Sequence, residues 1–160
     1  VQCAQLMSKP EKALKFCVSL SEKIKKEFKK IDIILSPAMG GIIVGYEIGK
    51  ILNVETIFSE RVNGEFKLRR DFVLKKNQNV LIVEDVITTG KSSLECSKLA
   101  EEFGANVIGY ASLIDRSNGN TAIKKKIISQ IELNIPAYTE EDLPISLKNI
   151  KAVKPGSRNL

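Results

Sequence analysis

The apolar and polar residues along the chain follow two periods, one typical of amphipathic helices and one of buried strands. Apolar side chains recur at helical spacing in three segments, 14–28, 42–52 and about 92–103. The Ser8 to Glu11 spacing matches a capping box, which predicts that the first helix begins there and ends near Lys30. Short runs rich in Val, Ile and Leu lie between these segments, and each predicts a buried strand: 31–35, 54–59, 79–83, 107–114 and 127–133.

Turn signals separate the predicted elements. Asn63-Gly64 stands between two alternating arms within residues 61–70, a pattern that predicts a β-hairpin. Gly104 ends the third helix, and the chain from Pro136 onward is expected to be irregular. Strands that alternate with helices predict an α/β fold, with a mainly parallel central sheet flanked by helices and ligand loops at the carboxyl ends of the strands.

The length of 160 residues, with 43% hydrophobic and 28% charged residues, predicts a single globular domain over residues 1–160. No apolar run approaches the roughly 20 residues that span a bilayer, so we expect no membrane segment. The net charge of +6 indicates an anionic partner, which at this point is a nucleic acid, a membrane surface or a phosphorylated metabolite.

The chain contains no histidine, which excludes Ser-His and Cys-His nucleophiles, histidine-ligated zinc and imidazole acids or bases. Catalysis must therefore depend on carboxylates, lysines, backbone dipoles or a bound ion. Three cysteines, Cys3, Cys17 and Cys96, form no C-x-x-C pair. An odd number of unpaired cysteines predicts buried thiols in a cytoplasmic protein.

Residues 80–93 form the segment with the strongest chemical signal. A buried strand leads to Glu84 and Asp85, and a loop of small residues, 88–92, then opens a helix. Backbone N–H groups and hydroxyls at a helix N-terminus suit a phosphate, and Gly90 lets the backbone approach it closely. The two carboxylates cannot bind that phosphate, so they should face a sugar diol or a magnesium ion. The segment therefore predicts a cradle for a ribose 5-phosphate.

Two commoner nucleotide motifs are excluded by spacing. Gly90-Lys91-Ser92 matches the end of a P-loop, but that motif needs glycine at position 85, where this chain has Asp85. Gly40-Gly41 followed by Gly45 does not have the G-x-G-x-x-G spacing of a dinucleotide site. A Walker ATPase and a Rossmann dehydrogenase are therefore not expected.

The run VLIVEDVITTGKSS at 80–93 resembles the phosphoribosyl pyrophosphate (PRPP) signature of type I phosphoribosyltransferases. The similarity extends over nearly the whole chain, because four more segments resemble orotate phosphoribosyltransferases: SPAMGGI at 36–42, FSERVNGEFKLRRDF at 58–72, LIDRS at 113–117 and KPGSR at 154–158. The resemblance implies transfer of the 5-phosphoribosyl group from PRPP to orotate, which gives orotidine 5′-monophosphate and pyrophosphate in pyrimidine biosynthesis. It also implies Mg²⁺ bound mainly through the PRPP diphosphate, without a dedicated set of protein ligands.

The same resemblance assigns roles to individual residues. Glu84, Asp85 and Arg61 are the expected catalytic residues, with the two acids on the ribose hydroxyls and Arg61 on PRPP. The expected PRPP contacts are these three together with Val86, Ile87, Thr88, Thr89, Gly90, Lys91 and Ser92. Thr88 and Arg116 are expected to contact orotate, and a guanidinium suits its carboxylate because it can bind both oxygens.

The hairpin region 61–76 is basic, with six Lys or Arg residues against two acids. The resemblance implies a flexible hairpin that closes over the site and onto the ligand of a partner subunit, in a homodimer, so that water is excluded. The plainer interpretation is a solvated edge hairpin that its charges protect from pairing.

Two features depart from the family pattern. Met39-Gly40 stand where some branches have Tyr-Lys, which leaves backbone N–H groups to hold the pyrophosphate. Family members also carry a preceding segment that covers orotate, of which only Val1-Gln2-Cys3 remains here. We therefore expect this N-terminal piece to be missing.

Two alternative functions fit parts of the pattern. A purine-type phosphoribosyltransferase would need an aromatic residue to stack on its base downstream of the PRPP loop, whereas Tyr110 is expected to face the core. A PRPP-sensing regulator would bind nucleic acid through its basic surface, consistent with a pI near 9.2. The chain has no helix-turn-helix signal and no aromatic-interleaved basic stripe, so no nucleic-acid partner is expected.

Overall fold

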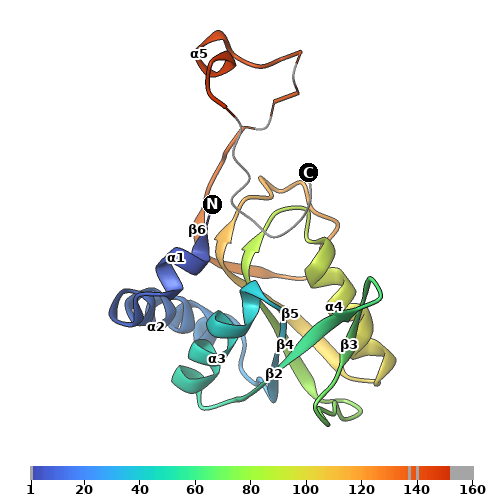
Figure 1. Cartoon of the computed structure of the whole chain (residues 1–160). Helices are drawn as coiled ribbons and strands as arrows, with labels where there is room; N and C mark the ends of the chain where they lie inside the picture. The colour runs from blue at the N-terminus through green and yellow to red at the C-terminus, as the bar shows by residue number, and fades with distance from the viewer. Residues whose placement is uncertain (1, 137, 140, 152–160) are drawn as a thin grey trace.

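The computed structural model describes residues 2–136, 138–139 and 141–151, and Figure 1 shows a twisted sheet with helices on both faces. Its strands are β1 (Ile33–Pro37), β2 (Glu55–Val62), β3 (Glu65–Leu68), β4 (Asn79–Ile87), β5 (Asn106–Asp115) and β6 (Ile127–Glu132). Its helices are α1 (Cys3–Met7), α2 (Pro10–Glu27), α3 (Gly40–Leu52), α4 (Lys91–Glu102) and α5 (Ile145–Lys148). The KPGSR segment at 154–158 lies outside the described residues.

The six strands form one sheet in the order β3-β2-β1-β4-β5-β6. All neighbouring pairs are parallel except β2 with β3, which form the antiparallel hairpin. The chain moves outward from β1 to β2 on one side and resumes at β4 on the other, so the strand order reverses between β1 and β4. In open parallel sheets, ligands bind at the carboxyl ends of the strands at this reversal point. The predicted α/β class is confirmed.

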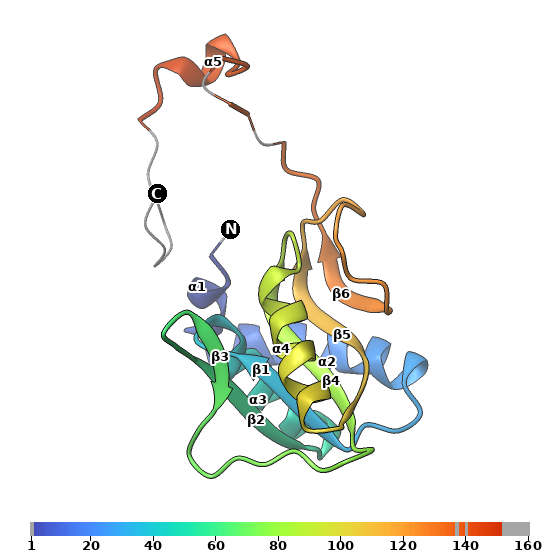
Figure 2. The ribbon, with the colours of Figure 1, turned by 90° about the vertical axis from the view of Figure 1, so that its right-hand side faces the viewer.

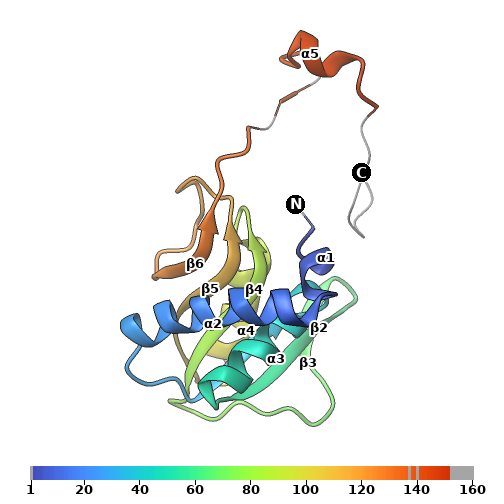
Figure 3. The same ribbon diagram turned by 90° about the vertical axis from the view of Figure 1, so that its left-hand side faces the viewer.

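The sheet separates two apolar cores. On one face lies α4, as Figure 2 shows, and the core on this face includes Leu35, Ile82 and Val107. On the other face lie α2 and α3, as Figure 3 shows, and the core there includes Ile34 and Leu81. Successive residues of β1 and β4 therefore serve different cores, which follows from the period of two in an extended strand.

The hairpin has the predicted turn. Asn63 and Gly64 both have positive φ, 52° and 88°, as a two-residue type I′ connection requires. The predicted capping box is wrong: the residue before α2 is Lys9, and Ser8 Oγ instead donates to the Gln5 carbonyl. Proline, whose fixed φ suits a first helical position, begins α2.

Two regions differ from the sequence prediction: one strand is longer, and one segment expected to be irregular contains a short helix. β4 continues through Ile87, so Glu84 and Asp85 lie within the strand and not after it. The region beyond Pro136 contains the one-turn helix α5, which Figures 1 to 3 all place away from the sheet. Within the described residues, no helix is long and apolar enough to cross a membrane.

Candidate functional site

The two predicted acids lie at the end of β4, next to the reversal point, and they point to opposite faces of the sheet. Glu84 faces α4 and accepts a hydrogen bond from Ser93 Oγ at 2.5 Å. Asp85 faces the start of α3, where a β-carbon built on Gly40 would lie 2.7 Å from Asp85 Oδ1. The strand thus presents one carboxylate to each helical layer.

Asp85 lies in a partly desolvated place. Its Oδ1 accepts a hydrogen bond from the Val86 N–H at 2.9 Å, and its carbonyl lies 3.7 Å from Cys3 Sγ on α1. Burial raises the pKa of the Asp85 carboxyl, and the hydrogen bond from Val86 offsets part of that rise. A carboxyl whose pKa is raised by burial is a candidate functional group, and the place of Asp85 beside the strand-order reversal supports that interpretation.

The predicted phosphate loop joins β4 to α4. Thr88 and Thr89 are exposed, and Gly90 immediately precedes the helix with φ 76°. A β-carbon at Gly90 would meet Thr121 Oγ1 at 2.5 Å, so this glycine is required by its backbone conformation and by its close neighbour. The positive end of the α4 dipole lies at this loop, as an anion site requires.

Arg116 lies beside the same strand end, as predicted. Its backbone N–H donates to the Ile87 carbonyl at 2.8 Å, which continues the ladder from β5 past the end of β4. The Arg116 Nε atom is buried and has no hydrogen-bond partner among the described residues. The neighbouring Asp115 carboxylate accepts from the Ser117 N–H at 2.7 Å. Unpaired buried donors are rare, so this guanidinium suits a ligand.

A threonine that the sequence analysis missed connects these two loops. Thr121 Oγ1 donates to the Thr89 carbonyl at 3.0 Å, so the loop that follows Arg116 is bound to the phosphate loop. The contacts of Ser93 with Glu84 and of Gly40 with Asp85 were missed in the same way, although these residues lie in segments that the motif analysis identified. Their contacts join residues distant in sequence, and only the fold reveals them.

Arg61 is placed on the outer side of α4. Its guanidinium bonds to Glu95 and to the Gly64 carbonyl, and it lies 4.1 Å from the centre of the Phe66 ring. The other basic residues of the hairpin are partly neutralised too, because Glu60 pairs with Arg69 and Arg70, and Glu65 pairs with Lys67. The excess positive charge predicted for this hairpin is therefore smaller than its own sequence indicates, since Glu60 and Glu95 lie outside the segment.

The three cysteines are free and buried, as predicted. Burial raises the pKa of Cys3 and Cys17 to about 11 and that of Cys96 to about 12, so these thiols stay protonated near neutral pH. They are therefore poor nucleophiles, which agrees with a site based on placed charge. Tyr110 is also buried and bonds to Ser97, so it is not available to stack on a base.

A surface hollow of about 430 Å³ lies elsewhere. It is lined by Tyr46, Lys50, Glu55 and neighbouring residues at the carboxyl end of α3, whereas Gly40 is at the amino end. None of the predicted site residues lines it. The site at the strand ends is therefore identified by its chemistry and not by this hollow.

An acid pair near a strand end, followed by a small-residue loop and a helix N-terminus, defines an α/β protein with a candidate anion site at the carboxyl ends of its strands. In agreement, residues 8–141 match the family model described as "Phosphoribosyl transferase domain". Curated relatives named orotate phosphoribosyltransferase are similar over the full chain. The protein of Parvibaculum lavamentivorans is 45% identical over 100% of this chain and 83% of its own length. The protein of Maricaulis maris is 42% identical over the same shares of the two chains. The chain therefore belongs to the phosphoribosyl transferase family, in its orotate phosphoribosyltransferase branch.

Solved structures support the fold. Orotate phosphoribosyltransferase from Aeropyrum pernix superposes with a TM-score of 0.71 at 17% identity, covering 83% of this chain and 78% of that one. Adenine phosphoribosyltransferase from Thermoanaerobacter pseudethanolicus gives a TM-score of 0.69 at 21% identity, covering 80% and 84%. At these identities the likeness shows a shared architecture and does not distinguish the bases.

Proposed function

We propose that this protein transfers the 5-phosphoribosyl group of PRPP to orotate and releases pyrophosphate, forming orotidine 5′-monophosphate for pyrimidine biosynthesis. The observation that carries the proposal is that the acid pair, the α4 N-terminus and Arg116 lie at the carboxyl ends of neighbouring strands, and that the buried Nε of Arg116 has no hydrogen-bond partner among the described residues. Identities of 41–45% to curated orotate phosphoribosyltransferases over 99–100% of the chain favour orotate as the acceptor.

Each part of the site has a role in this reaction. Glu84 and Asp85 hold the ribose hydroxyls, and the 5′-phosphate lies on the loop that ends at the α4 dipole. Thr88 and Arg116 hold orotate, with the guanidinium on its carboxylate. Once both substrates are fixed, displacement at the ribose C1 atom depends on placement and on stabilisation of charge, which needs no activated side-chain nucleophile.

The diphosphate leaves with several negative charges, and two groups of the chain can meet it. The Met39-Gly40 loop lies against Asp85 and offers backbone N–H groups to the diphosphate. Arg61 reaches the site when the hairpin closes and its bond to Glu95 breaks. A closed hairpin also excludes water from the reacting centre.

Mg²⁺ fits the oxygen donors of this site. Among the described residues no group of three or more His, Cys, Asp or Glu side chains could hold a metal ion. Mg²⁺ commonly keeps several waters and binds through one or two carboxylates together with substrate phosphates. The site therefore suits an ion that is held mainly by the PRPP diphosphate, which would neutralise the leaving group, while Glu84 and Asp85 hold the ribose hydroxyls.

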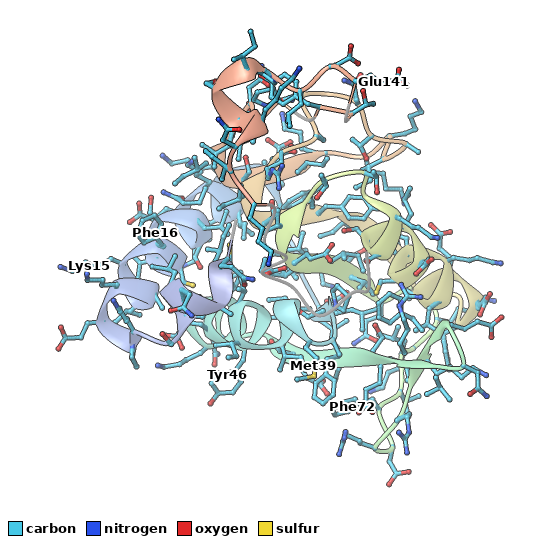
Figure 4. All side chains as sticks on the ribbon, turned by 45° about the horizontal axis from the view of Figure 1, so that its top comes forward. Lys15, Phe16, Met39, Tyr46, Phe72 and Glu141 are labelled. Atoms are coloured by element: carbon cyan, nitrogen blue, oxygen red, sulfur yellow. The ribbon has the colours of Figure 1, made fainter. Side chains whose placement is uncertain are left out.

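The protein also acts as a homodimer in this proposal, in the cytoplasm, where its unpaired thiols remain reduced. Support for the dimer comes from the outer face of α3, where Met39, Ile43 and Tyr46 are 83%, 55% and 64% exposed. Their i, i+4, i+7 spacing forms one apolar stripe, and Figure 4 shows Met39 and Tyr46 on the outer side of this helix. Contiguous apolar surface of this kind marks interfaces.

The test is orotidine monophosphate formation from orotate, PRPP and Mg²⁺, followed by the change in absorbance of the pyrimidine. A chain extended to the full length of its relatives should be assayed beside this one, with adenine and hypoxanthine as competing acceptors. Turnover with orotate supports the proposal. Turnover with a purine alone, or PRPP binding without transfer to any base, would replace it with one of the two alternatives.

A further inference from the structure

The first turn of α4 contains a buried hydroxyl that is bonded to the catalytic acid of β4. Ser93 is fully buried, and its Oγ donates to Glu84 Oε2 at 2.5 Å, the length of a charge-assisted O–H···O⁻ bond. Helix α4 has no side-chain cap in the described residues, so this hydroxyl does not serve its own helix end. The Ser93 hydroxyl instead connects α4 to β4 through its bond to Glu84.

The position of this bond in the chain gives it a second consequence. Glu84 lies in the strand that leads into the phosphate loop, and Ser93 lies directly after the loop, so their bond joins the strand before the loop to the helix after it. The bond therefore links the acid expected on the ribose to the helix whose N-terminus is expected to hold the phosphate. Asp85 has no such link to α4, since its Oδ1 is bonded to the neighbouring Val86 N–H.

The same face of α4 carries two more small polar side chains with partners on the sheet. Cys96 lies 3.1 Å from Ser59 on β2, and Ser97 bonds to the Tyr110 hydroxyl on β5. These contacts fix the helix on the sheet as the Ser93 bond does, yet neither touches an acid of the site. Ser97 is therefore a close internal reference for Ser93, because it differs mainly in its partner.

We propose that Ser93 is a positioning residue for PRPP, which orients the Glu84 carboxylate toward the ribose hydroxyls and holds it at a fixed distance from the phosphate loop. This inference rests on the proposed function for the identity of the ligand. It adds a residue that contacts no substrate and acts through Glu84.

The test compares Ser93→Ala with Ser97→Ala by direct titration of PRPP and by steady-state kinetics. We expect Ser93→Ala to weaken PRPP binding by roughly tenfold, the effect of losing a hydrogen bond to a charged group, and to leave the KM for orotate within twofold. Ser97→Ala should leave both constants within twofold of the parent, although it deletes the same group from the same helix face. Equal weakening of PRPP binding in the two variants would overturn the inference.

A double-mutant cycle distinguishes positioning from a general loss of packing. In a Glu84→Gln background, adding Ser93→Ala should weaken PRPP binding by less than a further twofold, because the carboxylate through which Ser93 acts is already absent. Additive effects of the two substitutions would contradict the proposal. If Ser93→Ala does not fold, Ser93→Cys offers a similar volume with only a weak donor and serves in the same comparison.

The outcome is separable from that of the proposed function. A parent protein that binds PRPP but does not convert orotate would contradict the function, and the PRPP titrations would still decide the role of Ser93. A parent that converts orotate, with Ser93→Ala indistinguishable from Ser97→Ala, would contradict the role of Ser93 alone.

Discussion

Gly40 lies against the carboxylate of Asp85 so closely that a β-carbon at Gly40 would be 2.7 Å from Asp85 Oδ1 and 2.8 Å from Oδ2. The loop after β1 and the acid of β4 therefore share one small volume. This contact places the backbone expected to hold the diphosphate next to the acid expected to hold the ribose.

Gly40→Ala should consequently disturb Asp85 more than it disturbs the helix. We expect a loss of roughly 1–3 kcal/mol in the free energy of unfolding, the range for overpacking, and at least tenfold weaker PRPP binding. Thermal unfolding and PRPP titration measure the two effects. In an Asp85→Ala background the obstacle is absent, so Gly40→Ala should cost less than half as much stability there, and an undiminished cost would show that Asp85 is not the obstacle.

Asp85→Asn should stabilise the unliganded protein at neutral pH while it weakens PRPP binding. The pKa of Asp85 is raised in the fold because burial disfavours its charge, so folding favours the protonated form. That contribution is fully present below the ordinary Asp pKa and is lost as the pH rises through the raised value. Asparagine removes the charge and keeps an acceptor for the Val86 N–H, so we expect a Tm about 2–4 °C higher at pH 7.

The comparison of Asp85→Asn with the parent at two pH values checks this cause. The gain in Tm should shrink below the ordinary Asp pKa, where the parent carboxyl is protonated as well. A gain of the same size at acid and neutral pH would indicate that charge burial is not responsible.

Arg116→Ala should raise the KM for orotate by tenfold or more and leave the KM for PRPP within twofold, because its unpaired Nε lies beside the strand end and its backbone is already bound to Ile87. Initial rates over a matrix of both substrates measure the two constants. Arg116→Lys should not restore the parent value, since an ammonium cannot form the two-point contact. An equal rise in both constants would remove the assignment to the base.

Glu95→Gln should strengthen PRPP binding if Arg61 leaves Glu95 to reach the diphosphate. The Arg61 and Glu95 side chains are 38% and 32% exposed, and pairs of this kind contribute about 0–1 kcal/mol to stability. Weakening the pair raises the fraction of Arg61 that is free, so the Kd for PRPP should fall by twofold to fivefold. Arg61→Ala should raise the Kd for PRPP. As the control, Glu95→Gln should no longer change this Kd when it is combined with Arg61→Ala.

Tyr46→Arg combined with Ile43→Asp should convert the proposed dimer into a monomer with little change in secondary structure. Both side chains are more than half exposed, so the charges cost little in a single subunit but would be buried in an interface on α3. Sedimentation velocity gives the mass of each variant. Exchange of two exposed charged residues of α2, Lys12→Glu and Glu22→Lys, also leaves the net charge unchanged and serves as a control that should leave the mass unchanged.

The period of the apolar residues predicted the core strands and the three long helices because those elements bury one face or both. The hairpin was predictable from Asn63-Gly64, since few residues tolerate positive φ at two successive positions. The capping box does not form because a helix that the sequence analysis missed, α1, ends at Met7, and the Ser8 hydroxyl donates to the Gln5 carbonyl in that helix. The four-residue motif carries no information about this preceding helix.

The residues of the site were recognised through their motif, but their relation in space was not. The strand was expected to end at Val83, whereas β4 continues to Ile87 and therefore directs Glu84 and Asp85 to opposite faces. The partners Ser93, Gly40 and Thr121 follow from how β1, α4 and the loop after β5 pack around that strand. Pairing of Arg61 with Glu95, 34 residues away, likewise depends on the tertiary fold.

The division of the two acids between the two faces of the sheet has a thermodynamic consequence. Glu84 is bonded to the layer formed by α4, and Asp85 touches the layer formed by α1 and α3. A single ribose held by both carboxylates joins the two layers through a small molecule at the rim of the sheet. Substrate binding then raises the free energy of opening either layer, so PRPP should slow amide exchange in α3 and α4 together, even though the sheet separates their cores.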